Sequence, residues 1–455
     1  MLEKLAAAAQ VPDIRRRLQF VLLIFAVYVL ALHVPAAGVD QNAMKGHLGG
    51  VLGMVDVFSG GALKKFSVIA MGIMPYINAS IIMQLLTVAI PKLQEKSKEG
   101  ESGRKEIAKI TRYASVVLGL VQSFGLYQVF SRPSATGPAA IAPGFGHMIT
   151  VMLTLTAGTM FLLWLGEQIT EKGIGNGVSL IIFVGIMVSI PTQIAQTATL
   201  AREDPSRIPG ILLMVLLFLA SIVGVVYMTQ AVRKIPVRHV KRIVGNRMSQ
   251  ESSAYLPLKV NTAGVIPVIF ATSILLFPAT VATYIRPDYK LGGFALGEVA
   301  KSAADWLQPG NNVWSSLIFA AFVLFFTYFY TAIQYDTNDI ADNLKKYGSF
   351  IPGIRPGKPT AEYLDKVLTR ITLAGAVFLA VISLIQYWAP VWTRVNTISL
   401  VGGTSLLIVV GVALETMQAI EAQMAMRNYE GFVKQPGATG EGRARGGGRP
   451  AYGTR

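Results

Sequence analysis

The sequence predicts an all-α integral membrane protein with ten transmembrane helices. Of the 455 residues, 52% are hydrophobic and 15% are charged, whereas a soluble domain carries about 25% charged residues. In addition, ten segments are apolar over roughly the 20 residues that a membrane-spanning helix needs. We therefore expect one integrated helical bundle and not a set of soluble domains.

The ten apolar segments define the elements in chain order. The first follows Arg15, Arg16 and Arg17, as in a signal peptide, but no clear small-residue cleavage motif comes after it. We interpret it as a retained helix. The ten spans are predicted near residues 18–34, 67–90, 113–130, 148–169, 178–195, 210–230, 263–283, 313–333, 371–391 and 399–420.

The distribution of basic residues predicts that both termini lie in the cytoplasm. In that orientation, 31 of the 41 Lys and Arg residues fall in cytoplasmic segments, as the positive-inside rule requires. The formal net charge of +16 is then mainly a feature of topology and docking.

Two predicted spans contain residues that interrupt helices. Each is the second helix of a five-helix half, and matching interruptions in two halves indicate inverted repeats with a functional site at their interface. We predict an N-terminal half at 1–195, a C-terminal half at 196–426 and a disordered cytoplasmic tail at 427–455, which is rich in Gly and Arg. The interrupting residues are Gly72, Pro75 and Asn78 in the second span, and Asn261, Gly264, Pro267 and Pro278 in the seventh.

Residues 51–66 (VLGMVDVFSGGALKKF) form an apolar segment that is too short to cross a membrane. Irregular backbone is tolerated at membrane depth only where it is buried in protein or lines a cavity. We predict a re-entrant segment that occludes a pore. A surface loop or an interfacial helix is the alternative.

The spans carry almost no charge, which bears on the class of function. Glu167 and Glu415 lie toward the predicted cytoplasmic ends, whereas an ion-coupled carrier buries ionisable groups near the midplane. This favours a passive conduit over a secondary transporter for a small solute, which is the alternative. We expect no enzyme, because phosphate-loop and nucleophile-elbow motifs are absent. We also expect no metal or other cofactor, because the chain has no cysteine and its four His residues lack metal-ligand spacing.

Two long cytoplasmic loops, 231–262 and 334–370, are rich in basic residues. Topogenic charge and attraction to anionic lipid explain their sign but not their length, because long loops more often carry function. We expect them to dock an acidic protein surface, or ribosomal RNA through phosphate contacts. In the first loop the bases include Arg233, Lys234, Arg238, Lys241, Arg242, Arg247 and Lys259, and the second loop holds Arg355 before Pro356.

Six motifs together resemble the SecY family of protein-translocation channels. The resemblance runs from about residue 12 to about residue 426 and leaves out the tail. The motifs are FSGGALKKFSVIAMGIMPYINASIIMQLL (58–86), KEGESGRKEIAKITRY (98–113), GTMFLLWLGEQITEKGIGNGVSLIIF (158–183), LPLKVNTAGVIPVIFATSILLFPAT (256–280), DIADNLKKYGSFIPGIRPG (339–357) and GGTSLLIVVGV (402–412).

The resemblance implies ten helices in two pseudo-symmetric five-helix halves around a central pore, hinged between the fifth and sixth spans. It implies an apolar pore ring, and branched apolar side chains of this kind gate by excluding water. The matching positions are Ile73, Ile77, Val178, Ile182, Ile269 and Ile408, of which Val178 replaces the more usual isoleucine.

The resemblance also implies a plug at 57–66, which includes Val57, Phe58, Ser59, Gly60, Gly61, Ala62 and Leu63. It implies a lateral gate between the second and seventh spans, to which we assign Asn78, Gln84, Asn261 and Pro267. Asn78 and Asn261 need hydrogen-bond partners, and interhelical bonds of this kind would form a weak latch.

The family further implies docking of partners on the basic loops. Arg355 matches a motor-coupling arginine, and Lys234 and Arg247 match basic ligands of the loop before the seventh span, although Asn246 stands where the family often has an arginine and 229–237 diverges. The implied partners are SecE and SecG subunits, a SecA motor ATPase or a ribosome, and polypeptides that bear signal sequences. The implied location is the bacterial plasma membrane, with a thylakoid membrane as the alternative.

Overall fold

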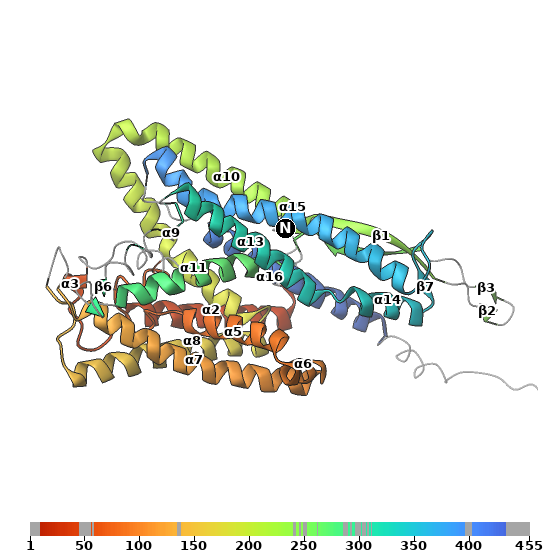
Figure 1. Ribbon diagram of the computed structural model, residues 1–455, viewed down its shortest axis with the longest axis horizontal. Coiled ribbons are helices and arrows are strands. Elements are labelled where there is room, and N and C mark those ends of the chain that lie inside the picture. The colour runs from red at the N-terminus through yellow and green to blue at the C-terminus, as the bar shows by residue number, and fades with distance from the viewer. Residues whose placement is uncertain are drawn as a thin grey trace, which may run out of the picture.

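The computed structural model describes residues 10–44, 56, 59–133, 138–239, 243–244, 247–248, 253–261, 263–284, 290–291, 294–295, 302, 306, 309–310, 312–395 and 403–433. Figure 1 shows an elongated bundle in which the long helices run roughly along one axis. One end carries α6, α14 and the strands β1 and β7, and the other end carries α3 and the turn between α9 and α10. We call these the α14 end and the α3 end.

Ten long or apolar helices correspond to the ten predicted spans. Their bounds are α2 Pro12–His33, α5 Met74–Ala89, α7 Glu101–Phe130, α8 Phe145–Lys172, α9 Gly177–Glu203, α10 Ile208–Gln230, α11 Ile266–Tyr284, α13 Val313–Gln334, α15 Lys358–Thr393 and α16 Gly403–Val433. Shorter helices are α3 Gln41–Met44, α6 Pro91–Lys98, the 3-10 turn η1 Pro205–Arg207 and α14 Thr337–Lys346.

The helices pack in two groups that α9 connects. In the first group α7 packs against α5 and α8, and α2 packs against α8; in the second, α13 packs against α11 and α15, and α15 also contacts α10 and α16. Figure 1 shows the first group below and the second above, with α9 crossing between them.

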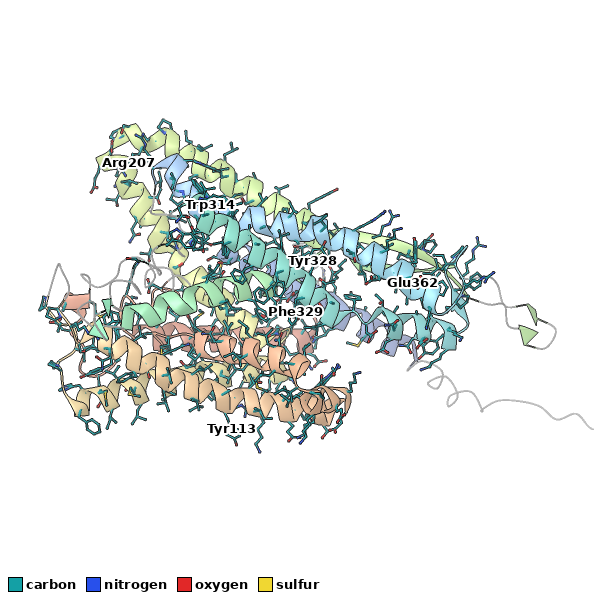
Figure 2. All side chains as sticks on the ribbon, viewed as in Figure 1. Tyr113, Arg207, Trp314, Tyr328, Phe329 and Glu362 are labelled. Carbon is teal, nitrogen blue, oxygen red and sulfur yellow. The ribbon has the colours of Figure 1, made fainter. Side chains whose placement is uncertain are left out.

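The membrane class is confirmed, whereas the number ten stays a prediction. Among the described residues, eight helices are long and apolar enough to cross a membrane, or nine if the bent pair α5 and α6 is one span. The outer surface is apolar as a lipid-facing surface must be: Tyr113 and Trp314, labelled in Figure 2, are 62% and 69% exposed. Large exposed apolar patches mark membrane contact.

Polar side chains fix where several helices begin. Asn176 precedes α9 and its side chain accepts a hydrogen bond from Ser179 N at 3.3 Å, and Asn312 does the same for Ser315 N at 2.6 Å before α13. Such N-caps satisfy backbone donors that the first helical turn leaves free.

The second span differs from its predicted range of 67–90. Ser67 forms an isolated bridge with Pro35, and residues 68–73 form turns. Helix α5 begins only at Met74, with Pro75 in its first turn, where the missing N–H of proline costs nothing. The helix ends at Ala89 because Pro91 restricts Ile90 to extended geometry, and α6 leaves at an angle of 100°.

The basic loops contain β structure, which the all-α prediction did not anticipate. Strand β1 (Val232–His239) pairs antiparallel with β4 (Ser253–Lys259) and with β7 (Ser349–Phe350), so the two loops join in one sheet. Alternate residues Ile235 and Val237 are buried against α15, as strand periodicity requires. The remaining described strands are β2 Ile243–Val244, β3 Arg247–Met248, β5 Lys290–Leu291 and β6 Phe294–Ala295.

Candidate functional site: an apolar constriction beneath a wide cavity

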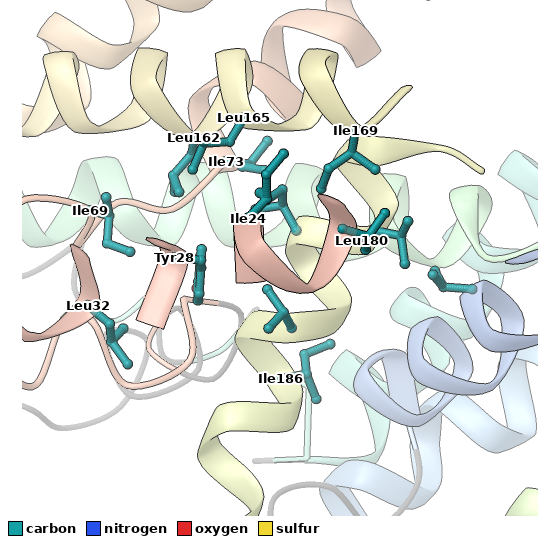
Figure 3. Close-up of a cluster of buried hydrophobic side chains, with 14 of the residues drawn as sticks. Ile24, Tyr28, Leu32, Ile69, Ile73, Leu162, Leu165, Ile169, Leu180 and Ile186 are labelled. Carbon is teal, nitrogen blue, oxygen red and sulfur yellow. The ribbon is translucent and has the colours of Figure 1, made fainter. Parts of the chain in front are cut away.

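Six apolar side chains from four helices come together in the middle of the bundle. All belong to one hydrophobic cluster, in which two are buried and four are partly buried. Figure 3 shows Ile73 within this cluster, among side chains of α2, α8 and α9. The six are Ile73 immediately before α5, Ile77 in the first turn of α5, Val178 and Ile182 at the start of α9, Ile269 near the start of α11 and Ile408 in α16.

The space at this cluster is narrow. Five of the six, all but Val178, line a cavity of about 20 Å³ together with Thr272 and Ser273. That volume holds about one water molecule. A cavity of about 880 Å³ reaches the same level and is lined by Ile77, Val178, Ile182 and Ile269. The wide cavity therefore ends at the cluster, which we call the constriction.

The walls of the wide cavity differ in polarity. Helices α7 and α8 contribute Lys105, Arg112, Glu167 and Glu171, whereas α11 contributes Ile266, Ile269 and Phe270. Arg112 Nη2 donates to Glu167 Oε1 at 2.5 Å, so Glu167, one of the two acids within the predicted spans, forms an ion pair at the cavity wall. The cavity presents a charged wall and an apolar wall, which suits a polypeptide of mixed composition better than a small solute.

The described part of residues 51–66 is folded into the bundle. Ser59, Gly60, Ala62 and Leu63 are buried, and Gly61 is half-buried. Tyr28 of α2 donates its hydroxyl to Ser59 O at 3.2 Å. Residues 51–55, Val57 and Phe58 lie outside the described residues. Its apolar residues Ala62, Leu63 and Phe66 are therefore covered by protein, while Lys64 and Lys65 remain exposed.

A buried carboxylate anchors this segment. Asp56, whose side chain is 4% exposed, accepts a hydrogen bond from Lys64 N at 2.9 Å and lies 3.5 Å from Lys64 Nζ. Burial raises the pKa of Asp56 above its ordinary value, and the contacts with Lys64 oppose that rise. Asp56 was not predicted as a site residue, because it lies between the first two spans and not within one.

Helices α5 and α11 share a hydrophobic cluster, in which Ile81 of α5 lies with Phe270 of α11. Among the predicted gate residues, Pro267 is buried in the first turn of α11, and Gln84 Nε2 donates to Ser80 Oγ at 3.3 Å. Asn78 is half-buried, and Asn261 is buried with no hydrogen-bond partner for its Oδ1. The described residues thus show no hydrogen bond between Asn78 and Asn261.

The predicted docking residues gather at the α14 end. Arg233 and Lys234 are exposed on β1, and Arg355 is exposed in the turn between β7 and α15. Ile235 of β1 packs in one cluster with Ile351 and Ile354, so the strand and the turn form one platform. Arg242 lies outside the described residues, and of Arg247 only the backbone is described.

Known proteins show the same sequence pattern over nearly the whole chain. The family model described as SecY matches residues 67–417. The chain belongs to the SecY family. It is 43% identical over 433 residues to the protein translocase subunit SecY of Halalkalibacterium halodurans, with 93% of this chain and 98% of that protein covered. The Escherichia coli K12 protein of the same name is 43% identical over 435 residues, with 95% and 96% covered.

Solved structures share the fold. A protein-conducting channel aligns with a TM-score of 0.64 at 17% identity, covering 92% of this chain and 95% of that one. Sec61 in the canine ribosome–channel complex aligns with a TM-score of 0.61 at 15% identity, covering the same shares. At such identities the likeness concerns the fold alone.

The structure adds three residues to this site that were not predicted from the sequence. Tyr28 holds the segment after Asp56, and Thr272 and Ser273 line the small cavity beside the five isoleucines. Tyr28 gave no sequence signal, because one tyrosine in an apolar helix is ordinary. Thr272 and Ser273 could have been found from the sequence, because they place two hydroxyl groups one helical turn after Ile269.

Proposed function

We propose that this chain is the protein-conducting subunit of a membrane channel, which translocates unfolded polypeptides and releases hydrophobic segments laterally into lipid. One observation carries the proposal: a cavity of about 880 Å³ ends at a cluster of six branched apolar side chains, five of which line a space for about one water. Such side chains can close by excluding water and deform around an extended chain. The names of the SecY relatives support the same function.

In this proposal the constriction is the pore ring and residues 57–66 are the plug. The burial of Ser59, Gly60, Ala62 and Leu63 in the bundle supports the plug role. The shared hydrophobic cluster that holds Ile81 of α5 and Phe270 of α11 supports a lateral gate between these helices. In this gate, Asn78, Gln84, Asn261 and Pro267 would tune the closed state. The halves 1–195 and 196–426 would move about the connection between α9 and α10.

The platform at the α14 end is the proposed docking face for a SecA motor ATPase or a ribosome. Its exposed Arg233, Lys234 and Arg355 offer donors to carboxylates or to phosphates of ribosomal RNA. The solved structure of Sec61 in a canine ribosome–channel complex supports a ribosome as one such partner. We further propose SecE and SecG as companion subunits, and anionic lipid at the basic loops.

We place the chain in the bacterial plasma membrane, with both termini and the α14 end in the cytoplasm. The asymmetry of Lys and Arg supports this orientation, and the bacterial sources of the two relatives support the membrane. A thylakoid membrane is the alternative that the same charge pattern allows.

Reconstitution tests the function. The chain, co-expressed with its companion subunits and placed in liposomes with the motor and ATP, should protect a secretory precursor from external protease. A precursor without its signal sequence is the control. Protection of both precursors or of neither, or uptake of a small solute without precursor, would favour a different function.

A further inference from the structure

The backbone of Gly60 lies directly against the backbone of α9 at Gly185. A Cβ added at Gly60 would stand 2.3 Å from Gly185 O and 2.9 Å from Gly185 C, and ordinary contact begins at 3.4 Å. The obstacle is helix backbone, which cannot rotate away as a side chain would. Any side chain at Gly60 therefore forces the segment and α9 apart by about 1 Å.

The same segment also contacts the start of the second span. A Cβ added at Gly72 would lie 3.7 Å from Ser59 Cα and Cβ, and Gly72 immediately precedes Ile73 of the constriction. Gly185 follows Ile182 of the constriction by three residues in α9, which is about 4.5 Å along the helix. Gly60 thus makes a close backbone contact with α9, and Ser59 lies beside Gly72, so the segment adjoins two walls of the constriction.

A third contact holds the segment from α2. Tyr28, 2% exposed, donates its hydroxyl to Ser59 O, and Ser59 Oγ donates to Asp56 O at 3.0 Å. Figure 3 shows Tyr28 of α2 and Ile186 of α9 in the cluster that encloses this region. The segment is therefore fixed from three sides at Ser59–Gly60.

We propose that Gly60 and Gly185 form the seat of the plug: their backbone contact, held by Tyr28, sets the position in which the closed constriction is sealed. The proposal rests on the proposed plug role and adds the residues that determine it. Because Ile182 and Ile73 adjoin the two contact points, lifting Gly60 off α9 frees both walls to separate.

The neighbouring Gly61 supplies a matched control. Gly60 and Gly61 have positive φ angles of +71° and +83°, so alanine strains the backbone at both positions. At Gly61, however, an added Cβ meets no atom within 4 Å. Gly61→Ala therefore reports the effect of backbone strain, and the difference from Gly60→Ala reports the contact with Gly185.

The experiment measures ion conductance of the resting channel in planar bilayers, with the full chain and its companion subunits. We expect the open probability of Gly60→Ala to exceed that of Gly61→Ala by about tenfold, the factor that a difference of about 1.4 kcal/mol produces. Tyr28→Phe keeps the ring and loses only the donor to Ser59, so we expect a rise of about fivefold over the parent, within the range that one hydrogen bond gives.

Equal conductance of Gly60→Ala and Gly61→Ala would overturn the seat. If Gly60→Ala does not insert, Tyr28→Phe decides alone, and parental conductance in that variant would overturn the proposal. Deletion of 57–66 separates the two levels of inference. If the deletion raises the resting conductance but Gly60→Ala and Tyr28→Phe do not, the seat is refuted and the plug role stands. If the deletion leaves the resting conductance unchanged, both are refuted.

Discussion

The constriction makes a quantitative prediction at Ile408. This side chain is 3% exposed, and it lines the cavity of about 20 Å³. Ile408→Ala removes three carbons, each of which contributes about 0.8 kcal/mol of apolar contact, or about 2.4 kcal/mol together. If half of this acts on the barrier that excludes water and ions, leakage through the resting channel rises roughly tenfold.

Leu407 provides the control for this substitution. It is adjacent in α16 and 1% exposed, but it packs in the cluster of α11, α13 and α15 and not at the constriction. Leu407→Ala removes the same number of carbons, and both variants should lose roughly 2–5 kcal/mol of stability. Conductance in planar bilayers should separate them. Equal leakage in the two variants would show that Ile408 is ordinary packing and refute the reasoning.

Three further predictions concern docking, the gate and the plug. Arg355→Lys should impair motor-driven translocation while insertion stays normal, because lysine lacks the planar fork of donors; full transport would contradict this. Asn78→Leu should shift the minimum hydrophobicity at which a signal sequence is accepted, because an apolar side chain replaces a half-buried amide that makes no bond to Asn261. An unchanged minimum over a set of signal sequences of graded hydrophobicity would refute this prediction. Burial raises the pKa of Asp56 above 3.8 in the seated plug, so seating weakens as pH rises from about 3.8 through that raised pKa. Leakage of the parent should rise over this window and that of Asp56→Asn should not; identical pH profiles would contradict the assignment.

The helical bundle was predictable from the sequence because long apolar runs have few alternatives in a membrane. Each predicted span overlaps a helix, but α7, α9, α15 and α16 each extend well beyond the predicted range at one end. Hydrophobicity alone did not predict the start of α5, because residues 67–73 are as apolar as the helix that follows; only the interruption at Gly72 and Pro75 indicated it. Their turns depend on contacts such as that of Val68 O with Gly158 of α8, which join positions far apart in the chain.

The candidate site was predictable only through the resemblance to a family. Isoleucines such as Ile269 and Ile408 look like any other residue of an apolar span, and hydrophobic periodicity cannot distinguish a pore lining from helix packing. The sheet of β1, β4 and β7 was hidden for a related reason: the basic residues dominate the loop, while its buried Ile235, Val237 and Leu258 are few. The contact between Gly60 and Gly185 could not be predicted from the sequence, because the two residues come together only in the folded structure.

The most direct test of the central claim is where a polypeptide in transit touches the chain. The chain has no cysteine, so one introduced thiol carries a single cross-linker without competing sites. A stalled precursor should cross-link to Ile182→Cys at the constriction and not to Val223→Cys, which is 68% exposed on the outer face of α10. Cross-linking at Val223 and none at Ile182 would contradict a polypeptide path through the constriction.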